Sequence, residues 1–178
     1  MNGVAPRAAR TLAIHPTSRG LGWVAFEGPF TPYDWGTTCP RKDKNTKCLR
    51  STEALIARFV PDTLVLEAFD RRHSVRGSRI ERLCLAIQSL AADRGIEVAI
   101  YTRGDVRACF AAVGAQSRDD IAAAVARHID ALREWLPKRR RPWETEHRRI
   151  SVFSAAALVL THYQLGAGRI FDEFNFAV

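Results

Sequence analysis

Apolar and polar positions divide the start of the chain into three short segments. Residues 12–14 and 22–26 are apolar, and the polar stretch between them contains Pro16, which is typical of a tight turn. A third segment, 33–38, follows a turn marked by Gly28. Short strands separated by turn residues pair with their neighbours. We therefore expect an antiparallel three-stranded meander.

Helical and strand patterns then alternate. Residues 51–59 and 78–95 place apolar side chains at helical spacing, whereas 63–69 form a near-continuous apolar run. Such a run is typical of a central strand that is covered on both faces, and 97–102 is expected as a fifth strand. The order predicts an α/β protein with a mixed five-stranded sheet flanked by helices.

Three more helices are predicted after the fifth strand. They are expected at 103–113, 117–136 and 151–164. The second of them begins with Ser117 as its N-cap. Gly166 is expected to end the third, because glycine is common just past the end of a helix.

Length and composition indicate one domain. The 178 residues, 47% of them hydrophobic, can bury a single core, so we expect one domain with a flexible N-terminus at 1–10 and a Phe-rich tail at 166–178. No apolar run approaches the roughly 20 residues that span a bilayer. The first ten residues have no apolar core of a signal peptide, so we expect a cytoplasmic protein without membrane contact. The net charge of +8 favours a polyanionic partner such as nucleic acid.

The four cysteines have two interpretations. Cys84 and Cys109 lie among apolar residues in helical patterns and are expected to be buried. Cys39 and Cys48 bracket the polar segment PRKDKNTK. They are either free thiols on a loop, which we favour, or half of a zinc site.

Glu67 is the first candidate for chemistry, because it ends the buried strand at 63–69. A carboxylate in that position is unfavourable unless something pairs with it. It is therefore part of a functional site, or it forms an ion pair with a neighbour such as Arg71 or Arg72.

Four segments together resemble one family. They are AIHPTSRGLGWVAF (13–26), PDTLVLEAF (61–69), DVRACFAAVGAQSRDDIAAAV (105–125) and SVFSAAALVLTH (151–162). Their order and content are similar to the RuvC-type Holliday junction resolvases. The resemblance implies a ribonuclease H-like fold and cleavage of branched DNA, in which four acidic side chains hold two Mg²⁺ or Mn²⁺ ions.

The resemblance places the four metal-ligand positions at His15, Glu67, Ser151 and Ser154. Only Glu67 is acidic. Serine supplies no charge, and neutral imidazole is a poor ligand for Mg²⁺, which prefers hard oxygen atoms. We therefore expect the metal-dependent cleavage to be lost or strongly reduced.

A rebuilt metal site is the alternative. Glu144, His147, Ser151 and Ser154 would share one helix face if the last helix began near Trp143. His147 and Glu144 could then join His15 and Glu67, and such a set suits Mn²⁺ or Zn²⁺ better than Mg²⁺. Otherwise the segment WETEHRR is simply an exposed helix start.

Candidate DNA-binding residues surround these positions. By the resemblance, Arg107 and Arg118 replace two lysines near the scissile phosphate, and Phe69 matches an aromatic residue that contacts the junction. Four further arginines near the site are candidates for phosphate contacts: Arg71, Arg72, Arg76 and Arg79.

Three functions remain open from the sequence. The first, which we favour, is a junction-binding protein that does not cut. The second is an active metal-dependent endonuclease with a rebuilt site. The third is a scaffold that contacts a protein partner through its Phe-rich tail and forms the homodimer, through the apolar face of the helix at 78–94, that the resemblance implies.

Overall fold

A five-stranded mixed sheet forms the centre of the protein in a computed structural model that describes residues 8–69 and 77–175. The strands are β1 (Arg10–Pro16), β2 (Leu21–Glu27), β3 (Pro32–Thr38), β4 (Thr63–Glu67) and β5 (Glu97–Tyr101), in the spatial order β3-β2-β1-β4-β5. The first three strands pair antiparallel, as the alternating pattern predicts, and β1, β4 and β5 run parallel. The carboxyl ends of β1, β4 and β5 therefore lie at one edge of the sheet.

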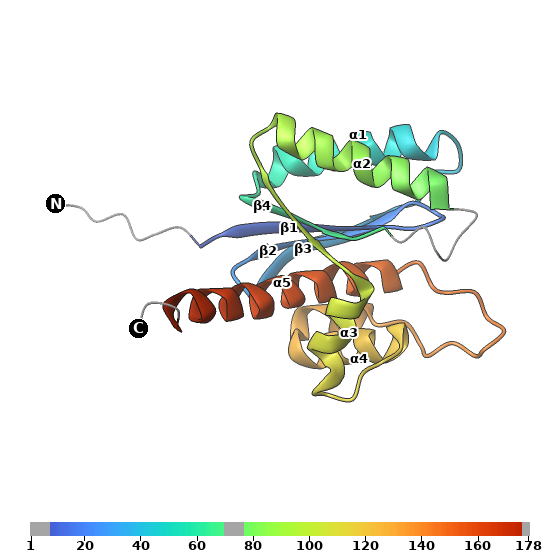
Figure 1. Ribbon diagram of the computed structural model, residues 1–178. Helices are drawn as coiled ribbons and strands as arrows, with labels where there is room; N and C mark the ends of the chain where they lie inside the picture. Colours follow the sequence, from blue (N-terminus) through green and yellow to red (C-terminus); the bar gives the residue numbers. More distant parts are fainter. Residues whose placement is uncertain (1–7, 70–76, 176–178) are drawn as a thin grey trace.

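Helices cover both faces of this sheet (Figure 1). They are α1 (Lys44–Phe59), α2 (Gly77–Asp93), α3 (Arg103–Ala111), α4 (Arg118–His128) and α5 (Ile150–Asn175). The first two lie on one face, and α5 lies on the other with α3 and α4 beneath it. This is the α/β architecture that the sequence predicts.

Side-chain alternation along the central strands divides the core in two. Leu12 and Ile14 of β1 pack with α1 and α2, whereas Ala13 packs with α4 and α5. In β4, Val65 joins the α5 side. Because alternate residues of a strand point to the same face, His15 and Glu67 are placed on the α5 side as well.

Two predicted helices have different bounds. Helix α1 begins at Lys44 rather than Ser51, and Cys48 is fully buried on its apolar face four residues before Thr52. Cys48 is therefore not a loop thiol, whereas Cys39 is exposed. The helix predicted over 117–136 ends at His128, because Ile129 is extended, and a short 3₁₀-helix (η2, Asp130–Trp135) follows.

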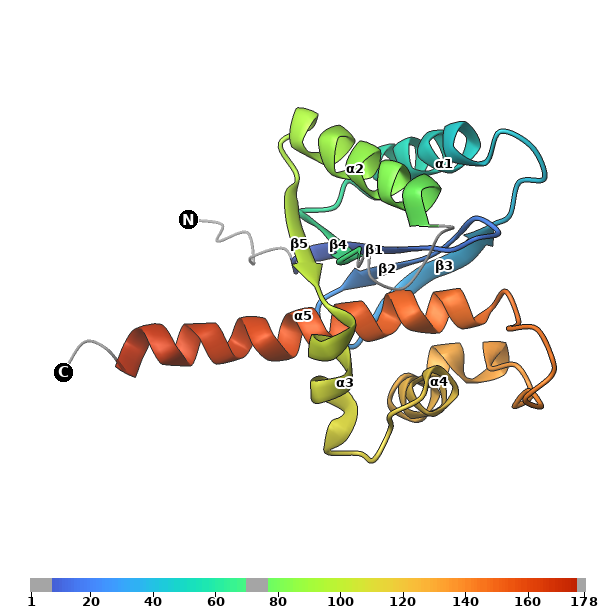
Figure 2. The same ribbon diagram turned by 45° about the vertical axis from the view of Figure 1, so that its right-hand side comes forward.

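The last helix is longer than predicted at its C-terminal end. The backbone of α5 stays helical past Gly166 to Asn175, so most of the expected 166–178 tail is helix. An internal glycine disfavours a helix by only about 1 kcal/mol relative to alanine, which the surrounding sequence overcomes. Figure 2 shows α5 extending past the sheet and the other helices. Among the described residues, no helix is long and apolar enough to cross a membrane.

Candidate nucleic-acid interface

The two central parallel strands bring His15 and Glu67 together. Ile14 of β1 is aligned with Leu66 of β4, so the next residue of each strand lies side by side at the carboxyl edge. His15 Nδ1 lies 3.0 Å from Glu67 Oε2. His15 is only 5% exposed. Among the described residues, its Nδ1 makes this close contact with Glu67 but no hydrogen bond of good geometry. The two residues that the sequence singles out thus form a buried pair.

A guanidinium group approaches Glu67 from the other side. Arg103 Nε lies 3.5 Å from Glu67 Oε1, on the first turn of α3. Burial would raise the pKa of the Glu67 carboxyl, but His15 and the positive charges of Arg103 and Arg118 lower that pKa to about 2. Glu67 is therefore ionised at neutral pH. The positive charges of its protein neighbours already offset its negative charge.

Two capped helix starts hold the cationic residues in place. Thr102 and Asp105 form a capping box at the start of α3, which directs Arg103 toward Glu67. Ser117 is the N-cap of α4, as predicted, and forms a second capping box with Asp120. Arg118, the first residue of α4, forms an ion pair of 3.2 Å with Glu146.

These side chains line an open cleft of about 690 Å³ at the carboxyl edge of the sheet. It is lined by His15, Thr17, Ser18, Glu67, Phe69, Cys84, Arg103, Arg118 and Glu146, among others. A small recess of about 70 Å³ continues beneath it, and Arg107, Gln116 and Ser154 line this recess together with His15 and Glu67. The structure therefore brings together six predicted site residues: His15, Glu67, Phe69, Ser154, Arg107 and Arg118.

Cysteine chemistry is disfavoured in the cleft. Burial, together with the negative charges of Glu67 and Glu81, raises the pKa of the Cys84 thiol to about 11. A thiol reacts as the thiolate. Cys84 is therefore protonated at neutral pH and is a poor nucleophile and metal ligand.

The donor set does not fit two Mg²⁺ ions. Among the described residues, Glu67 is the carboxylate that pairs with His15, and its other oxygen already pairs with the guanidinium of Arg103. Across residues 8–69 and 77–175, no group of three or more histidine, cysteine, aspartate or glutamate side chains is arranged to hold a metal. Hard divalent ions need several oxygen ligands, so the described residues of this pocket do not fit such a metal pair.

Three of the remaining predicted ligands lie elsewhere. Helix α5 begins at Ile150 and not near Trp143, so Glu144 and His147 do not share its face with Ser151 and Ser154. Both are exposed: the Glu144 carboxylate accepts from the backbone N–H of Arg141, and His147 Nδ1 accepts from that of Arg149. Ser151 is buried, and its Oγ donates to the carbonyl of Arg148.

Arg79 holds the turn that carries part of the cleft. Its guanidinium donates to Thr17 O and to Asn45 Oδ1, each at 2.8 Å. These contacts link the β1–β2 turn to α1. The guanidinium of Arg79 therefore stabilises the fold at this turn. Arg71, Arg72 and Arg76 lie outside the described residues.

Phe69 lies at the wall of the cleft. Its ring contacts Gly77 at the start of α2 so closely that a Cβ at Gly77 would be 2.5 Å from Phe69 Cζ. The absence of a side chain at Gly77 therefore lets the ring pack there. Phe69 is half-buried in this position and lines the cleft.

Sequence reasoning missed Arg103 and Glu146. A signal for Arg103 existed, because Tyr101 pairs with Glu67 and Arg103 follows two residues later at the same edge. No local signal identified Glu146, which reaches Arg118 from the loop before α5.

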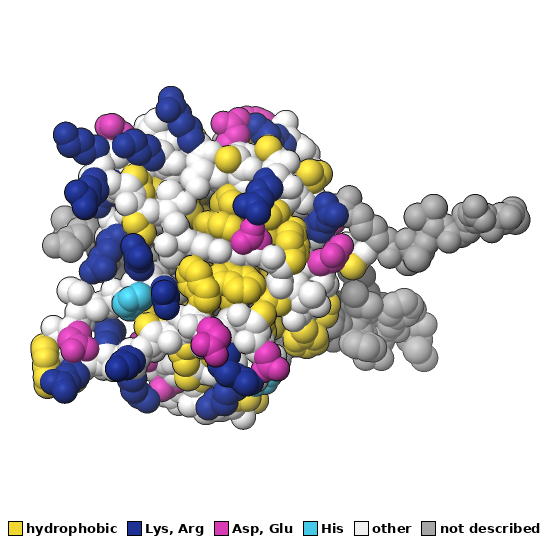
Figure 3. All heavy atoms as spheres, turned by 180° about the vertical axis from the view of Figure 1, so that it is seen from behind, with side chains coloured by type: hydrophobic (Ala, Val, Ile, Leu, Met, Phe, Trp, Pro, Cys, Tyr) yellow, Lys and Arg dark blue, Asp and Glu magenta, His cyan; other side chains and the backbone are white. Residues whose placement is uncertain are grey.

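That loop carries a concentration of positive charge. Residues 137–149 include six lysine and arginine residues: Lys138, Arg139, Arg140, Arg141, Arg148 and Arg149. Figure 3 shows Lys and Arg side chains gathered at the end of the molecule that carries the β1–β2 turn and this loop. We call residues 137–149 the basic loop.

Comparison with known proteins identifies the fold. No protein-family model matches the sequence, and no curated protein matches it significantly. The structure is similar to Thermus thermophilus RuvC in complex with a Holliday junction, with a TM-score of 0.66 and 15% identity over 89% of this chain and 95% of that one. It is also similar to the yeast mitochondrial Holliday junction resolvase Ydc2, with a TM-score of 0.57 and 12% identity over 97% and 89% of the two chains.

A viral resolvase extends the comparison. Fowlpox virus resolvase, solved with its Holliday junction substrate, has a TM-score of 0.51 and 13% identity over 82% of this chain and 94% of that chain. Each match covers more than four fifths of both chains. The chain therefore has the ribonuclease H-like fold that the RuvC-type Holliday junction resolvases share.

Proposed function

We propose that this protein binds branched DNA in the cleft at the carboxyl edge of its sheet and does not cleave it by a two-metal mechanism. The observation that carries the proposal is the neutralised Glu67 carboxylate, with His15 at 3.0 Å and Arg103 at 3.5 Å. A site of this kind has lost its attraction for metal cations. It keeps the charges that attract a phosphate.

The balance of charge supports an anionic ligand. Arg103, Arg107 and Arg118 line the cleft and its recess, against the carboxylates of Glu67 and Glu146. Arginine presents a planar fork of N–H donors that matches phosphate oxygens, and its charge persists at every physiological pH. The overall charge of +8 adds long-range attraction to a polyanion.

The solved relatives indicate which polyanion to test first. Two structures with the same fold contain a Holliday junction, one in RuvC and one in the fowlpox virus enzyme. A fold that presents phosphate-binding groups in a cleft at one edge can select DNA by shape and bending rather than by base sequence. Phe69 offers an aromatic ring at the wall of that cleft.

A homodimer is a second part of the proposal. Leu85 on α2 is 58% exposed although the opposite face of the same helix is buried against the sheet. A second copy packed on this face would cover Leu85 and present two clefts to the symmetric arms of a junction. Size-exclusion chromatography with light scattering of the wild type and of Leu85→Glu tests this part, and a monomeric wild type would contradict it.

The direct test uses a labelled four-way junction and a linear duplex of matching sequence. Binding and cleavage are measured in EDTA, Mg²⁺, Mn²⁺ and Zn²⁺, for the wild type and Glu67→Ala. We expect tight, junction-selective binding in EDTA and no cleavage in any metal. Metal-dependent cleavage that Glu67→Ala abolishes would instead establish an active nuclease with a rebuilt site.

A further inference from the structure

We propose that Trp143 stacks on an unpaired base of the nucleic acid that the cleft holds. The inference rests on the proposed function and adds to it a second contact point on the basic loop. Trp143 is 75% exposed, the highest value for a large apolar side chain in the described part of the protein. Burial of an indole ring is strongly favourable, so its exposure here is unexplained by packing.

The loop holds Trp143 in place. Arg140 pairs with Asp119 at 3.4 Å and Arg139 pairs with Asp120 at 3.3 Å, which ties the loop to the start of α4. A turn then surrounds the tryptophan, in which the Glu144 N–H donates to Arg141 O at 3.0 Å. The Glu144 carboxylate in turn accepts from the Arg141 N–H at 2.9 Å.

This ordering matters for affinity. A side chain on a fixed turn loses less conformational entropy on binding than one on a free loop. The geometry is thus suited to a preformed contact.

The chain connects Trp143 directly to the cleft. Glu146, three residues later, lines the cleft and pairs with Arg118 at 3.2 Å. Three residues span at most about 11 Å. Because nucleotides along one strand of a duplex are spaced by about 3.4 Å, a base within about three nucleotides of a phosphate at Arg118 can reach the indole.

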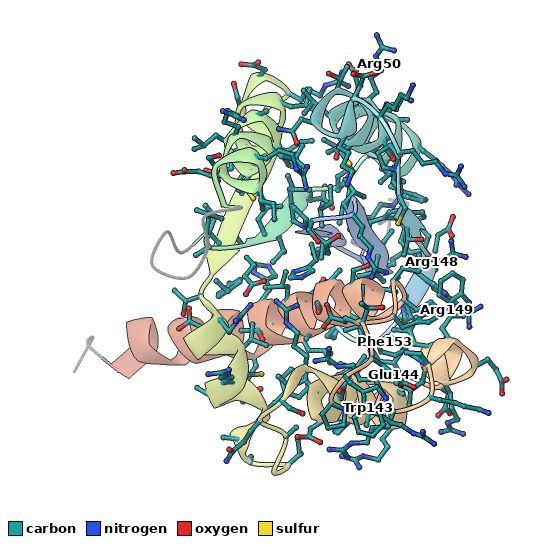
Figure 4. All side chains as sticks on the ribbon, turned by 90° about the vertical axis from the view of Figure 1, so that its right-hand side faces the viewer. Arg50, Trp143, Glu144, Arg148, Arg149 and Phe153 are labelled. Carbon is teal, nitrogen blue, oxygen red and sulfur yellow. The ribbon has the colours of Figure 1, made fainter. Side chains whose placement is uncertain are left out.

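The surroundings of Trp143 favour a nucleic acid over a protein partner. Its neighbours in the loop are cationic, and the Arg141 guanidinium lies 5.8 Å from the centre of the indole ring. Figure 4 shows Trp143 and Glu144 on the basic loop on the side of the protein that faces the viewer, with Arg148 and Arg149 nearer the start of α5. A single exposed aromatic ring among arginines matches a base flanked by phosphates, which is how proteins bind single strands.

The test compares Trp143→Ala, Trp143→Phe and Phe30→Ala in the full-length protein. Phe30 is a matched control because it is 65% exposed but lies beyond the far end of β2, away from the cleft. The probes are a four-way junction, a duplex with one unpaired 2-aminopurine, and the fully paired duplex. Thermal melting confirms that all variants fold.

We expect Trp143→Ala to weaken binding to the junction and to the unpaired-base probe on the order of 10-fold. Binding to the paired duplex should change by less than about 2-fold, since stacking needs an exposed base face. Trp143→Phe should retain most of the affinity, and Phe30→Ala should match the wild type. The wild type should also quench the fluorescence of the unpaired 2-aminopurine, and Trp143→Ala should not.

Two results would overturn the inference, and they are distinguishable. If the wild type binds branched DNA and Trp143→Ala binds it equally well, stacking at Trp143 is wrong and the proposed function stands. If the wild type binds none of the three probes while it binds an unrelated protein partner, the inference and the proposed function both fail.

Discussion

His15 Nδ1 lies 3.0 Å from Glu67 Oε2 at the carboxyl edge of the two central strands. In a two-metal nuclease of this fold, the resemblance places a carboxylate at each of these two positions. Here one of them is an imidazole, and Arg103 completes the neutralisation of the other. The predictions below follow from this change in charge and from the packing around it.

Glu67→Gln should destabilise the fold in a pH-dependent manner. The pKa of Glu67 in the folded state, about 2, lies below its usual value of about 4.5. The ionised carboxylate therefore contributes stability above about pH 4.5 and loses it as the pH falls toward 2. At pH 7 we expect the substitution to lower the free energy of unfolding by up to about 3 kcal/mol.

Urea unfolding between pH 7 and pH 3 measures this effect. The difference between wild type and Glu67→Gln should shrink as the pH falls below 5. Glu53→Gln is the matched control, because Glu53 pairs with Arg94 at the exposed surface and should contribute less than about 1 kcal/mol. A wild-type advantage that stays constant down to pH 3 would contradict the ionised pair.

Restoring two carboxylates should create a cation site. In His15→Asp/Ser154→Asp, three carboxylates would meet at the recess where His15, Glu67 and Ser154 now lie. Their repulsion should destabilise the variant in EDTA. Saturating Mn²⁺ should raise its melting temperature on the order of 5 °C.

The wild type is the control for this gain. Its melting temperature should be the same in Mn²⁺ and EDTA. An equal rise in both proteins would mean that the native residues already hold the ion.

Arg107→Ala should weaken DNA binding in a salt-dependent way. Arg107 lines the recess, and within the described part of the chain it forms no ion pair with a carboxylate, so its removal leaves no acid unpaired. If Arg107 contacts a phosphate, the plot of log affinity against log salt concentration should become less steep in Arg107→Ala, by about 1 in slope.

Fluorescence anisotropy from low to high salt gives that slope. Arg94→Ala, at the far end of α2, removes the same charge away from the cleft and should leave the slope nearly unchanged. Equal slopes for all three proteins would exclude Arg107 from the interface.

Gly22→Ala should separate β2 from the start of α5. A Cβ at Gly22 would lie 2.3 Å from Ser151 Oγ and 2.4 Å from the Ser151 carbonyl carbon. Because one of these atoms is backbone, the helix must shift, and we expect a loss of about 1–3 kcal/mol in stability.

Gly104→Ala is the control for the glycine substitution itself. It lies in α3, and its nearest neighbour would be the Thr102 hydroxyl at 3.4 Å. It should be neutral or slightly stabilising. Chemical denaturation measures the stability of both variants. If Gly22→Ala proved as stable as the wild type, the close approach of Gly22 to Ser151 would be refuted.

The sequence predicted the sheet and the central pair because both follow from short-range patterns. The meander appears as alternation around Pro16, and the apolar run before Glu67 identifies a strand buried on both faces. Parallel pairing then brings His15 to Glu67 without further information. Local sequence patterns are therefore enough to predict the fold and the His15–Glu67 pair.

The rest of the site depends on contacts between segments that are distant along the chain. Arg79 donates hydrogen bonds to Thr17 and Asn45. The residues next to Arg79 in the sequence give no indication of either partner. The alternative start of the last helix near Trp143 is wrong: α5 begins at Ile150, next to the predicted start at 151, and the turns of WETEHRR bring Glu146 to Arg118. Tertiary hydrogen bonds and ion pairs decide these positions.

The buried pair of His15 and Glu67 also changes what the fold requires from its surroundings. Four clustered carboxylates repel one another until divalent ions bind between them. The active site of such a protein is therefore complete only when the cell supplies the ions. Here the Arg103 guanidinium serves as the counterion of Glu67, and an imidazole takes the place of a second carboxylate. Under the proposed function, the cleft is consequently assembled as soon as the chain folds, and we expect its shape to be the same with and without a chelator.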